Sequence, residues 1–480
     1  MLNAVAPAPP LVVDLDGTLL RSDLLVESAV LFLRDSPQRF WLPFLWLARG
    51  KAVLKQRLAQ ATQIDVSSLP FSPEVMALVR EARDAGRKVV LATASDRKLA
   101  EDVAAQLGLF DEVLASDGTR NLCAAHKRDV LVERFGEHGF DYVGNAHDDL
   151  PILAVARRGF LIDPQPGLEG RAKRLGAPIE VLGAGSERRL ATWLKAVRLH
   201  QWLKNLLIFV PLLASHQITD PLLLWKGLLA FVFFGLCASS VYFLNDLFDL
   251  PEDRQHPVKR ERPFASGRLS VKAGLLMVPV LLVSAFLGAV LLLPLEFAGI
   301  LAMYYLLTLA YSLDLKRRMI VDVMTLAALY TIRVIAGAAA FGLTLTFWIL
   351  AFSMFVFLSL AIVKRYAELH AAAELGRLGQ TPGRGYRPSD MSMVAVLGSV
   401  SGYLAVLVLA LYIHDEGTVH MYARPEIIWL AIPLLLFWIS RVWMLAHRGQ
   451  MNEDPLLFAV RDRVSLVVGL LFALVFWSAI

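Results

Sequence analysis

The sequence predicts two parts of different architecture: an α/β, Rossmann-like domain with a helical cap, followed by an all-α bundle of nine transmembrane helices. The chain has 480 residues and is 56% hydrophobic, which is too long and too apolar for one soluble domain. Residues 1–195 carry charges every few positions, whereas residues 196–480 repeat apolar runs of about 17–24 residues, enough to span a bilayer. We therefore assign 1–182 to the α/β domain, 183–195 to a linker and 196–480 to the membrane domain.

The first part has the character of a cytoplasmic domain. The two cysteines, Cys123 and Cys237, lie in different halves and fit a reducing compartment. Met1 is followed by a short neutral stretch without a secretory signal pattern. The apolar piece 31–47 is interrupted by Arg34, Asp35, Arg39 and Pro43. This favours a cap helix, either free or resting on the membrane surface, over a span.

Two carboxylates end the first predicted strand. The strand runs from Leu11 into Asp14-Leu15-Asp16-Gly17-Thr18. Side chains alternate along a strand, so Asp14 and Asp16 point the same way. One carboxylate can attack a phosphate while the other acts as general acid and base.

The DxDGT pattern resembles the first motif of the haloacid-dehalogenase (HAD) phosphatases, and the later motifs follow in order. Thr93 ends a strand at 88–92, Lys127 follows, and a third strand at 142–144 leads into Asn145-Ala146-His147-Asp148-Asp149. The resemblance implies a Rossmann-like HAD fold with a helical cap at about 21–75, in which Thr93 and Lys127 bind the phosphoryl group.

For catalysis, the same resemblance implies that Asp14 is the nucleophile and Asp16 the acid and base. It also implies that Asp14, Asp16 and Asp149 hold Mg²⁺. Asn145 stands where the family usually has an aspartate. Two interpretations therefore stay open: an active phosphatase, or a degenerate domain kept for regulation or docking.

Nine apolar segments make up the predicted membrane domain. Lys and Arg gather in alternate connections, whereas the other connections contain only Arg424. The positive-inside rule places the basic set in the cytoplasm, so we expect an integral protein of the cytoplasmic membrane with a cytoplasmic N-terminal domain and an external C-terminus. The segments are 200–216, 222–245, 274–293, 296–313, 320–341, 346–363, 391–413, 426–445 and 464–480, and the basic connections are 246–273, 314–319, 364–390 and 446–463.

The second apolar segment ends in a dense acidic cluster. Asp246, Asp249 and Asp253 are spaced i, i+3, i+7, so they share one face of a helix. Such a cluster beside hydrocarbon is costly unless a positive group neutralises it. Mg²⁺ bound to a diphosphate would do so, because Mg²⁺ prefers a few carboxylates with phosphate oxygens. The alternative is an acidic loop that balances nearby Lys and Arg.

Asn245, Asp246, Asp249 and Asp253 fit the NDxxDxxxD signature of the UbiA superfamily of intramembrane prenyltransferases, at the place where that family has it. The resemblance implies a nine-helix fold and a Mg²⁺ site made by these four residues. Asp249 and Asp253 are its implied catalytic residues.

A second acidic motif typical of many UbiA members is altered here. The family pattern resembles DxxYAxxDxxxD, whereas this chain has Lys364-Arg365-Tyr366-Ala367-Glu368. Lys and Arg bind phosphate without a metal. With basic residues in place of the acidic ones, this segment resembles that of the decaprenyl-phosphate phosphoribosyltransferases. Those enzymes use phosphoribosyl diphosphate as donor and a polyprenyl phosphate as acceptor. That resemblance covers nearly all of 196–480. It implies that the protein works within the lipid bilayer and does not bind nucleic acid. The oligomeric state stays open.

Several basic residues and one tyrosine are candidates for binding these substrates. Each basic residue has an alternative role as a topology-setting charge. For the intramembrane Arg333, the alternatives are a functional site and a partner for a buried carbonyl. The candidates are Lys204, Lys259, Arg260, Arg262, Lys316, Arg333, Lys364, Arg365 and Tyr366.

Three functions remain in competition. The first is a polyprenyl-phosphate phosphoribosyltransferase whose product, a lipid-linked ribose 5-phosphate, is dephosphorylated by the HAD-like domain. The second is an aromatic-acceptor prenyltransferase of the same fold, against which the altered second motif argues. The third is a transporter or lipid-binding protein, which would not need a metal–diphosphate site. We also expect residues 190–480 alone to retain transfer.

Overall fold

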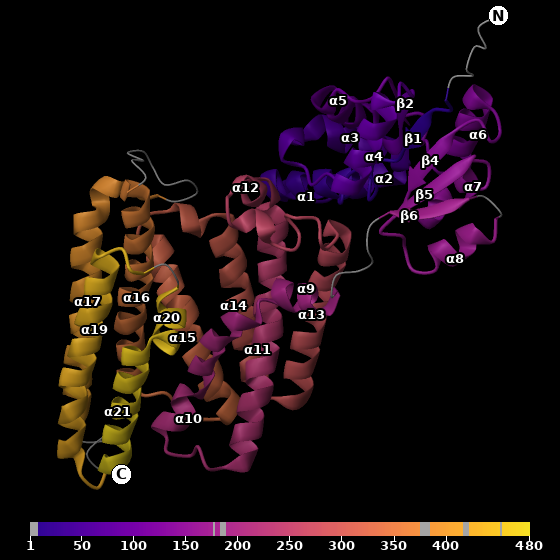
Figure 1. The fold of residues 1–480 in the computed structure, drawn as a ribbon. Coiled ribbons are helices and arrows are strands. Elements are labelled where there is room, and N and C mark those ends of the chain that lie inside the picture. Colours follow the sequence, from indigo (N-terminus) through magenta and orange to yellow (C-terminus); the bar gives the residue numbers. More distant parts are fainter. Residues whose placement is uncertain (1–7, 176–177, 183–188, 375–384, 416–421, 452–453) are drawn as a thin grey trace, which may run out of the picture. The chain divides into compact units, whose positions relative to one another are not determined.

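The computed structural model (Figure 1) describes the chain except residues 1–7, 176–177, 183–188, 375–384, 416–421 and 452–453. Its contacts divide into two compact units. The first unit contains Met1–Val197 and Tyr242–Val278, and the second contains Arg198–Val241 and Pro279–Ile480. The segment that carries the acidic cluster therefore packs with the α/β domain. The predicted linker begins outside the described residues, and its remainder lies in helix α9, Arg189–Val197.

A six-stranded parallel sheet forms the core of the first unit, in the order β3-β2-β1-β4-β5-β6. Its central strands are apolar and buried on both faces, as is usual for parallel sheets. The three strands predicted from the motifs, β1, β2 and β4, are neighbours at the centre, so their carboxyl ends meet at one edge. The strands are β1 Leu11–Val13, β2 Val89–Asp96, β3 Glu112–Ser116, β4 Asp141–Gly144, β5 Arg158–Ile162 and β6 Ile179–Leu182.

Helices connect these strands, and the region between β1 and α4 is helical, as predicted for the cap. Its first helix begins after Asp23, whose carboxylate accepts a hydrogen bond from the backbone N–H of Val26 at 3.1 Å. The helices are α1 Leu24–Asp35, α2 Leu42–Ala48, α3 Lys51–Ala61, α4 Pro73–Asp84, α5 Arg97–Leu107, α6 Ala124–Phe135, α7 Leu150–Leu153 and α8 Leu168–Lys173, with short 3₁₀ helices η1 Pro37–Arg39, η2 Val66–Ser68 and η3 His147–Asp149.

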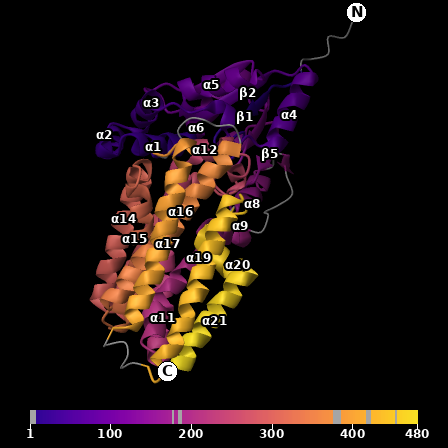
Figure 2. The ribbon, with the colours of Figure 1, turned by 90° about the vertical axis from the view of Figure 1, so that its left-hand side faces the viewer.

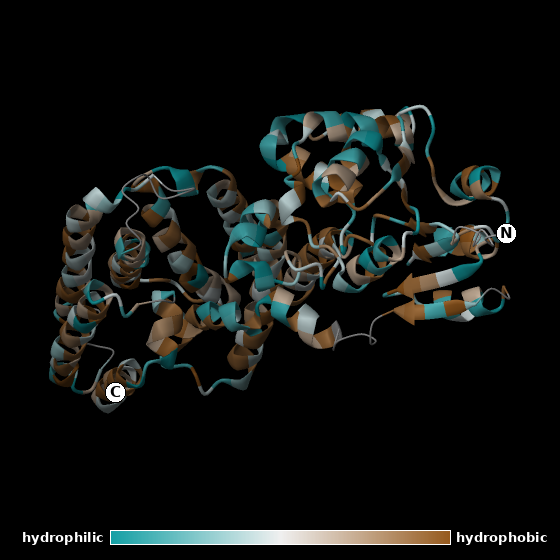
Figure 3. Ribbon diagram, turned by 45° about the horizontal axis from the view of Figure 1, so that its top comes forward, coloured by the Kyte–Doolittle hydropathy of each residue, from teal (hydrophilic) through white to brown (hydrophobic). Residues whose placement is uncertain are grey.

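Long apolar helices dominate the rest of the chain, and Figure 3 colours the ribbon by the hydropathy of each residue. Seven described helices are long and apolar enough to cross a membrane: Pro221–Phe248, Val271–Leu292, Leu295–Leu313, Val321–Phe341, Phe347–Glu374, Pro388–Ile413 and Pro425–His447. The remaining elements are η4 Leu199–Phe209, α10 Val210–Ala214, α11 Pro221–Phe248, α12 Leu250–Gln255, η5 Lys259–Glu261, α13 Val271–Leu292, α14 Leu295–Leu313, η6 Leu315–Arg317, α15 Val321–Phe341, α16 Phe347–Glu374, η7 Pro388–Asp390, α17 Met391–Ile413, η8 Pro425–Leu430, α19 Ala431–His447, α20 Pro455–Arg461 and α21 Arg463–Ala479.

The predicted number of nine transmembrane helices is not confirmed. The first predicted span is a 3₁₀ helix, η4, continued by the short α10, and α21 has only 17 residues. Hydropathy alone does not reveal this difference, because a 3₁₀ segment is as apolar as an α-helical one. The structure supports a helical membrane domain with seven candidate spans.

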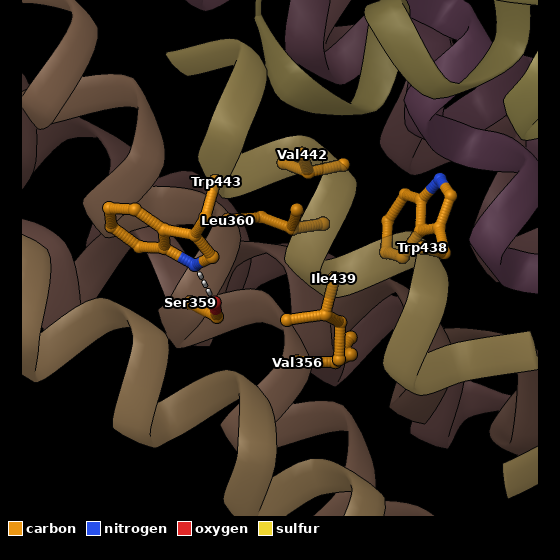
Figure 4. A pocket seen from close by; sticks show the side chains of 7 residues that line it. All are labelled: Val356, Ser359, Leu360, Trp438, Ile439, Val442 and Trp443. Carbon is orange, nitrogen blue, oxygen red and sulfur yellow. Dashed lines mark hydrogen bonds between the residues drawn. The ribbon is translucent and has the colours of Figure 1, made fainter. Parts of the chain in front are cut away.

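The helices of the second unit pack side by side, as α17, α19 and α21 do in Figure 2. Polar side chains join them at a few points. Figure 4 shows one, where the indole of Trp443 on α19 donates to the hydroxyl of Ser359 on α16 at 3.1 Å among apolar neighbours. The Ser359 hydroxyl in turn donates to the carbonyl of Gly398 on α17 at 2.7 Å. One serine therefore connects three helices.

Gly337 allows η4 to approach α15 closely. A Cβ placed on Gly337 would lie 1.9 Å from the backbone oxygen of Ile208. A backbone atom cannot swing aside as a flexible side chain can. Small residues at such crossings let helix backbones touch in membrane domains.

We predict that Gly337→Ala destabilises the membrane domain by about 1–3 kcal/mol, because the added methyl group overpacks the contact with η4. Gly299→Ala on α14 is the matched control, since a Cβ there meets nothing within 4 Å. The measurement is the midpoint of thermal unfolding in detergent. Equal midpoints for the two variants would show that η4 does not pack against α15 as described.

Candidate active sites

The first site lies where β1 and β4 end. The ammonium group of Lys127 donates to Asp14 Oδ1 at 2.6 Å and lies 3.8 Å from Asp149 Oδ1. The Thr18 hydroxyl lies 3.3 Å from Asp14 Oδ2 and 3.4 Å from Asn145 Oδ1. The structure thus brings residues from three of the predicted motifs together.

Asp16 faces the end of β2. Its Oδ2 accepts from the hydroxyl of Ser95 at 2.5 Å and lies 3.5 Å from that of Thr93. Its Oδ1 accepts from the backbone N–H of Leu24, the first residue of α1, at 2.8 Å. The sequence analysis identified Asp16 and Thr93 but missed Ser95, two residues further along the same strand.

Burial sets the electrostatics of this site. It raises the pKa of Asp14 to about 6, against the attraction of Lys127, and it raises the pKa of Asp16 to about 7. Burial opposes the charge on Lys127, but the carboxylates of Asp14 and Asp149 outweigh it and raise the pKa of Lys127. The site therefore pairs one firmly charged lysine with two carboxyl groups that protonate near neutrality.

Asp149 is engaged by protein donors. Its Oδ1 accepts from the Tyr142 hydroxyl at 2.7 Å, and its Oδ2 accepts from the backbone N–H groups of Asn145 and Ala146 at 3.0 and 2.9 Å. As placed, Asp149 holds the turn after β4. Asn145 Oδ1 and Asp14 Oδ2 share the Thr18 hydroxyl as a neighbour. The metal role of Asp149 stays a prediction.

A cap lysine reaches the same edge of the sheet. Lys55 on α3 donates to the carbonyl of Ala94 at 2.5 Å and to the side chain of Asn121 at 2.8 Å. Burial lowers the pKa of Lys55, although the carboxylate of Asp16 favours its charge. Lys55 lies outside the sequence motifs, and the sequence analysis did not identify it.

The acidic cluster at the end of α11 also belongs to the first unit. Arg262 donates to Asp246 Oδ1 at 3.0 Å and to Asp253 Oδ2 at 2.5 Å. Both carboxylates are nearly buried, and burial raises the pKa of Asp253. The two acids therefore converge on one cationic group, which is the arrangement a bound cation would need.

The helix that carries the cluster is interrupted at Asp249. Helix α11 ends at Phe248 and α12 begins at Leu250, whereas the sequence analysis placed the three acids on one helix. Hydrogen bonds from the N–H of Asp249 to the carbonyl of Asn245, and from Asp253 to Asp249, keep the i to i−4 spacing. Among the described residues, no group of three or more His, Cys, Asp or Glu is gathered to hold a metal ion.

A buried ion pair connects this cluster to the cap. Arg254 donates to both carboxylate oxygens of Glu27 at 2.9 and 2.6 Å, and the two side chains are 5% and 3% exposed. Glu27 lies on α1, and Arg254 directly follows Asp253. A more exposed pair, Arg34 with Glu252, lies nearby. A protein made of residues 190–480 alone would lack Glu27. Its acidic cluster would therefore lose one of the contacts that support it.

The second unit contains a basic cluster. Lys204 and Lys364 donate to the same oxygen of Asp454 at 2.8 and 3.3 Å, and the hydroxyl of Tyr330 lies 3.1 Å from Asp454 Oδ1. Two ammonium groups share one carboxylate, so the cluster carries surplus positive charge. Lys364 stands where the second acidic motif was expected, and an anion could bind here.

Other predicted substrate residues have different surroundings. Arg333 is buried; its guanidinium donates to Asn205, to the hydroxyl of Tyr304 and to the carbonyl of Leu329, which favours the packing alternative. Arg365 is 1% exposed and donates to Asp322, Glu368 and Tyr311, joining α14, α15 and α16.

Four more candidates complete the set. The Tyr366 hydroxyl lies 3.0 Å from Nδ1 of His447, and the tyrosine is buried. Lys316 is half-buried in η6, and Lys259 and Arg260 are exposed in η5. Of the nine predicted substrate residues in the membrane part, Lys204, Lys364 and Arg262 therefore have the clearest geometry for an anion.

These features define a class of protein: an integral membrane transferase joined to a phosphohydrolase-like α/β domain. Residues 206–466 match the UbiA prenyltransferase family, and residues 11–154 match the haloacid dehalogenase-like hydrolases. The chain belongs to the UbiA prenyltransferase family. It is an enzyme of that family with an additional hydrolase-like domain.

Three relatives span this architecture to different extents. The protein y4nM of Sinorhizobium fredii, described as uncharacterized, is 36% identical over 98% of this chain and 91% of its own. The nodulation protein NoeC of Azorhizobium caulinodans is 40% identical over 59% of this chain and 92% of its own. The decaprenyl-phosphate phosphoribosyltransferase of Mycobacterium tuberculosis is 31% identical over 58% of this chain and 90% of its own.

We predict that Glu27→Gln lowers stability by about 3–5 kcal/mol, because it leaves the guanidinium of Arg254 buried without its counter-charge. Glu252→Gln removes a carboxylate from the exposed pair and is expected to cost at most about 1 kcal/mol. Both variants are compared with wild type by thermal unfolding in detergent. A Glu27→Gln midpoint no lower than that of Glu252→Gln would contradict the buried pairing.

Proposed function

We propose that the membrane domain transfers 5-phosphoribose from phosphoribosyl diphosphate to a polyprenyl phosphate, with Mg²⁺ as cofactor. The observation that carries the proposal is the Lys204–Lys364–Asp454 cluster, which puts surplus positive charge where other members of the family have an acidic motif. The phosphoribosyltransferase relative, of which the chain covers 90%, supports the same choice of substrates.

The donor site of this proposal is the acidic cluster. Asn245, Asp246, Asp249 and Asp253 would hold Mg²⁺, and the convergence of Asp246 and Asp253 on Arg262 fits a cation at that place. When bound, the ion neutralises the diphosphate that leaves the ribose. Arg262, released from the carboxylates, can then bind a diphosphate oxygen.

The acceptor is a lipid phosphate, which is already anionic at neutral pH. One of its oxygens attacks C1 of the ribose, and diphosphate departs with the bonding electrons. No general base is needed, unlike for a phenol acceptor. Lys204 and Lys364 hold the acceptor phosphate, while Asp454 keeps the two ammonium groups together before the lipid arrives.

We also propose a topology. The segments Leu199–Ala214 and Arg463–Ala479 add two crossings to the seven long helices, which gives nine. The basic connections and the N-terminal domain then lie in the cytoplasm, where a water-soluble donor is available, and the C-terminus lies outside.

For the HAD-like domain we propose that it removes the 5-phosphate of the lipid-linked product. Asp14 attacks phosphorus, the ribose O5 leaves with a proton from Asp16, and water then hydrolyses the aspartyl phosphate. Lys127 holds the phosphoryl oxygens beside Asp14. Asn145 supplies a neutral oxygen in place of a carboxylate beside Asp14.

We predict that Asp253→Asn lowers transfer by at least about a hundredfold, because the donor site loses a preorganised charge. The assay is incorporation of label from radioactive phosphoribosyl diphosphate into polyprenyl phosphate by the purified protein with Mg²⁺. Glu252→Gln, which removes the adjacent exposed carboxylate, should keep near-normal transfer.

The same assay separates the rival functions. Near-normal turnover by Asp253→Asn would refute the donor site. A wild-type protein that instead transfers a prenyl group from a prenyl diphosphate to a phenol would establish the aromatic-acceptor alternative. Binding of labelled lipid without any transfer would leave a carrier as the better interpretation.

We predict that Asp14→Asn leaves transfer unchanged and makes the phosphorylated lipid accumulate, since an amide cannot form the aspartyl phosphate. The change is nearly isosteric, so the domain should still fold. Mass spectrometry of lipid extracts measures the ratio of 5-phosphoribosyl to ribosyl lipid. Equal ratios in wild type and variant would show that the domain does not process this product.

A further inference from the structure

The cap carries an exposed apolar patch. Five large side chains on α2 and on the two residues before it are 46–69% exposed. We call them the cap patch: Phe40, Trp41, Phe44, Leu45 and Leu47. An exposed cluster of this kind marks an interaction surface rather than ordinary surface variation.

The cap patch is attached to the end of a membrane helix within the first unit. Arg34, near the end of α1, donates to the backbone carbonyl of Phe248 at 3.0 Å, and Phe248 is the last residue of the candidate span α11. The ring of Phe32 on α1 lies 5.3 Å from that of Trp46 on α2. These contacts hold α2 close to the level at which α11 leaves the apolar layer.

Basic side chains border the cap patch. Arg39, Arg49 and Lys51 are all exposed next to it. Cationic groups around Trp, Phe and Leu are typical of segments that lie in the interface of a membrane with anionic lipids. A second copy is a poorer match, because self-association would bring these like charges together.

We propose that the cap patch inserts into the headgroup region of the same bilayer that α11 spans. The bilayer is then a second support for the HAD-like domain, besides the Glu27–Arg254 pair. Lys55, on the helix that follows α2, belongs to the same cap, so the phosphatase-like site is held beside the lipid surface. This inference does not depend on either proposed activity.

The test uses the full-length protein in nanodiscs of phosphatidylcholine and phosphatidylglycerol. Both native cysteines, Cys123 and Cys237, are replaced by alanine, and Phe44→Cys carries an environment-sensitive fluorophore. Glu101→Cys, on the exposed face of α5, is the matched control. Lipids with a spin label in the upper acyl chain should quench the probe at 44 about twofold more than the probe at 101, given an insertion depth of about 5–10 Å.

Two results would overturn the proposal. Equal quenching at both positions would show that the cap patch stays in water. A probe at 44 that is shielded from water but insensitive to spin-labelled lipid would show that protein covers it, with a second copy as the occupant. In support, the double charge reversal Arg39→Glu with Arg49→Glu should lower quenching at 44 and leave the control unchanged.

Discussion

The buried pair between Glu27 and Arg254 is the contact on which the arrangement of the acidic segment depends. It joins residues 227 positions apart and connects the cap with Tyr242–Val278, which belongs to the same compact unit. Breaking such a pair leaves a buried charge without its partner, which costs several kcal/mol. The two side chains are therefore strongly held in this geometry. The acids next to Arg254 are therefore positioned by a helix of the cap as well as by the membrane helix that carries them.

A common rule explains the three charged clusters. Lys127 with Asp14, Arg262 with Asp246 and Asp253, and Lys204 and Lys364 with Asp454 each combine opposite charges inside the protein. Unpaired charges would be too costly in these surroundings. Under the proposed functions, a substrate or ion would bind at each cluster by replacing one of these partners.

The sequence predicted the parts that depend on local motifs. Asp14 follows β1, Thr93 lies in β2 and Lys127 lies in the first turns of α6, so their convergence at one edge of a parallel sheet could be expected. The Glu27–Arg254 pair could not, because neither residue belongs to a motif and the chain between them is long. Hydropathy likewise did not distinguish the 3₁₀ geometry of Leu199–Phe209 from a spanning α-helix. The sequence also did not reveal that the guanidinium of Arg365, predicted to bind phosphate, pairs with Asp322, Glu368 and Tyr311.

The bridge made by Arg262 has a consequence for biogenesis. The chain neutralises its own acidic cluster with a residue only nine positions beyond Asp253. This short loop can close as soon as α11 has entered the bilayer, before the later helices are synthesised. Burial of the acidic cluster during biogenesis therefore does not depend on a bound ion.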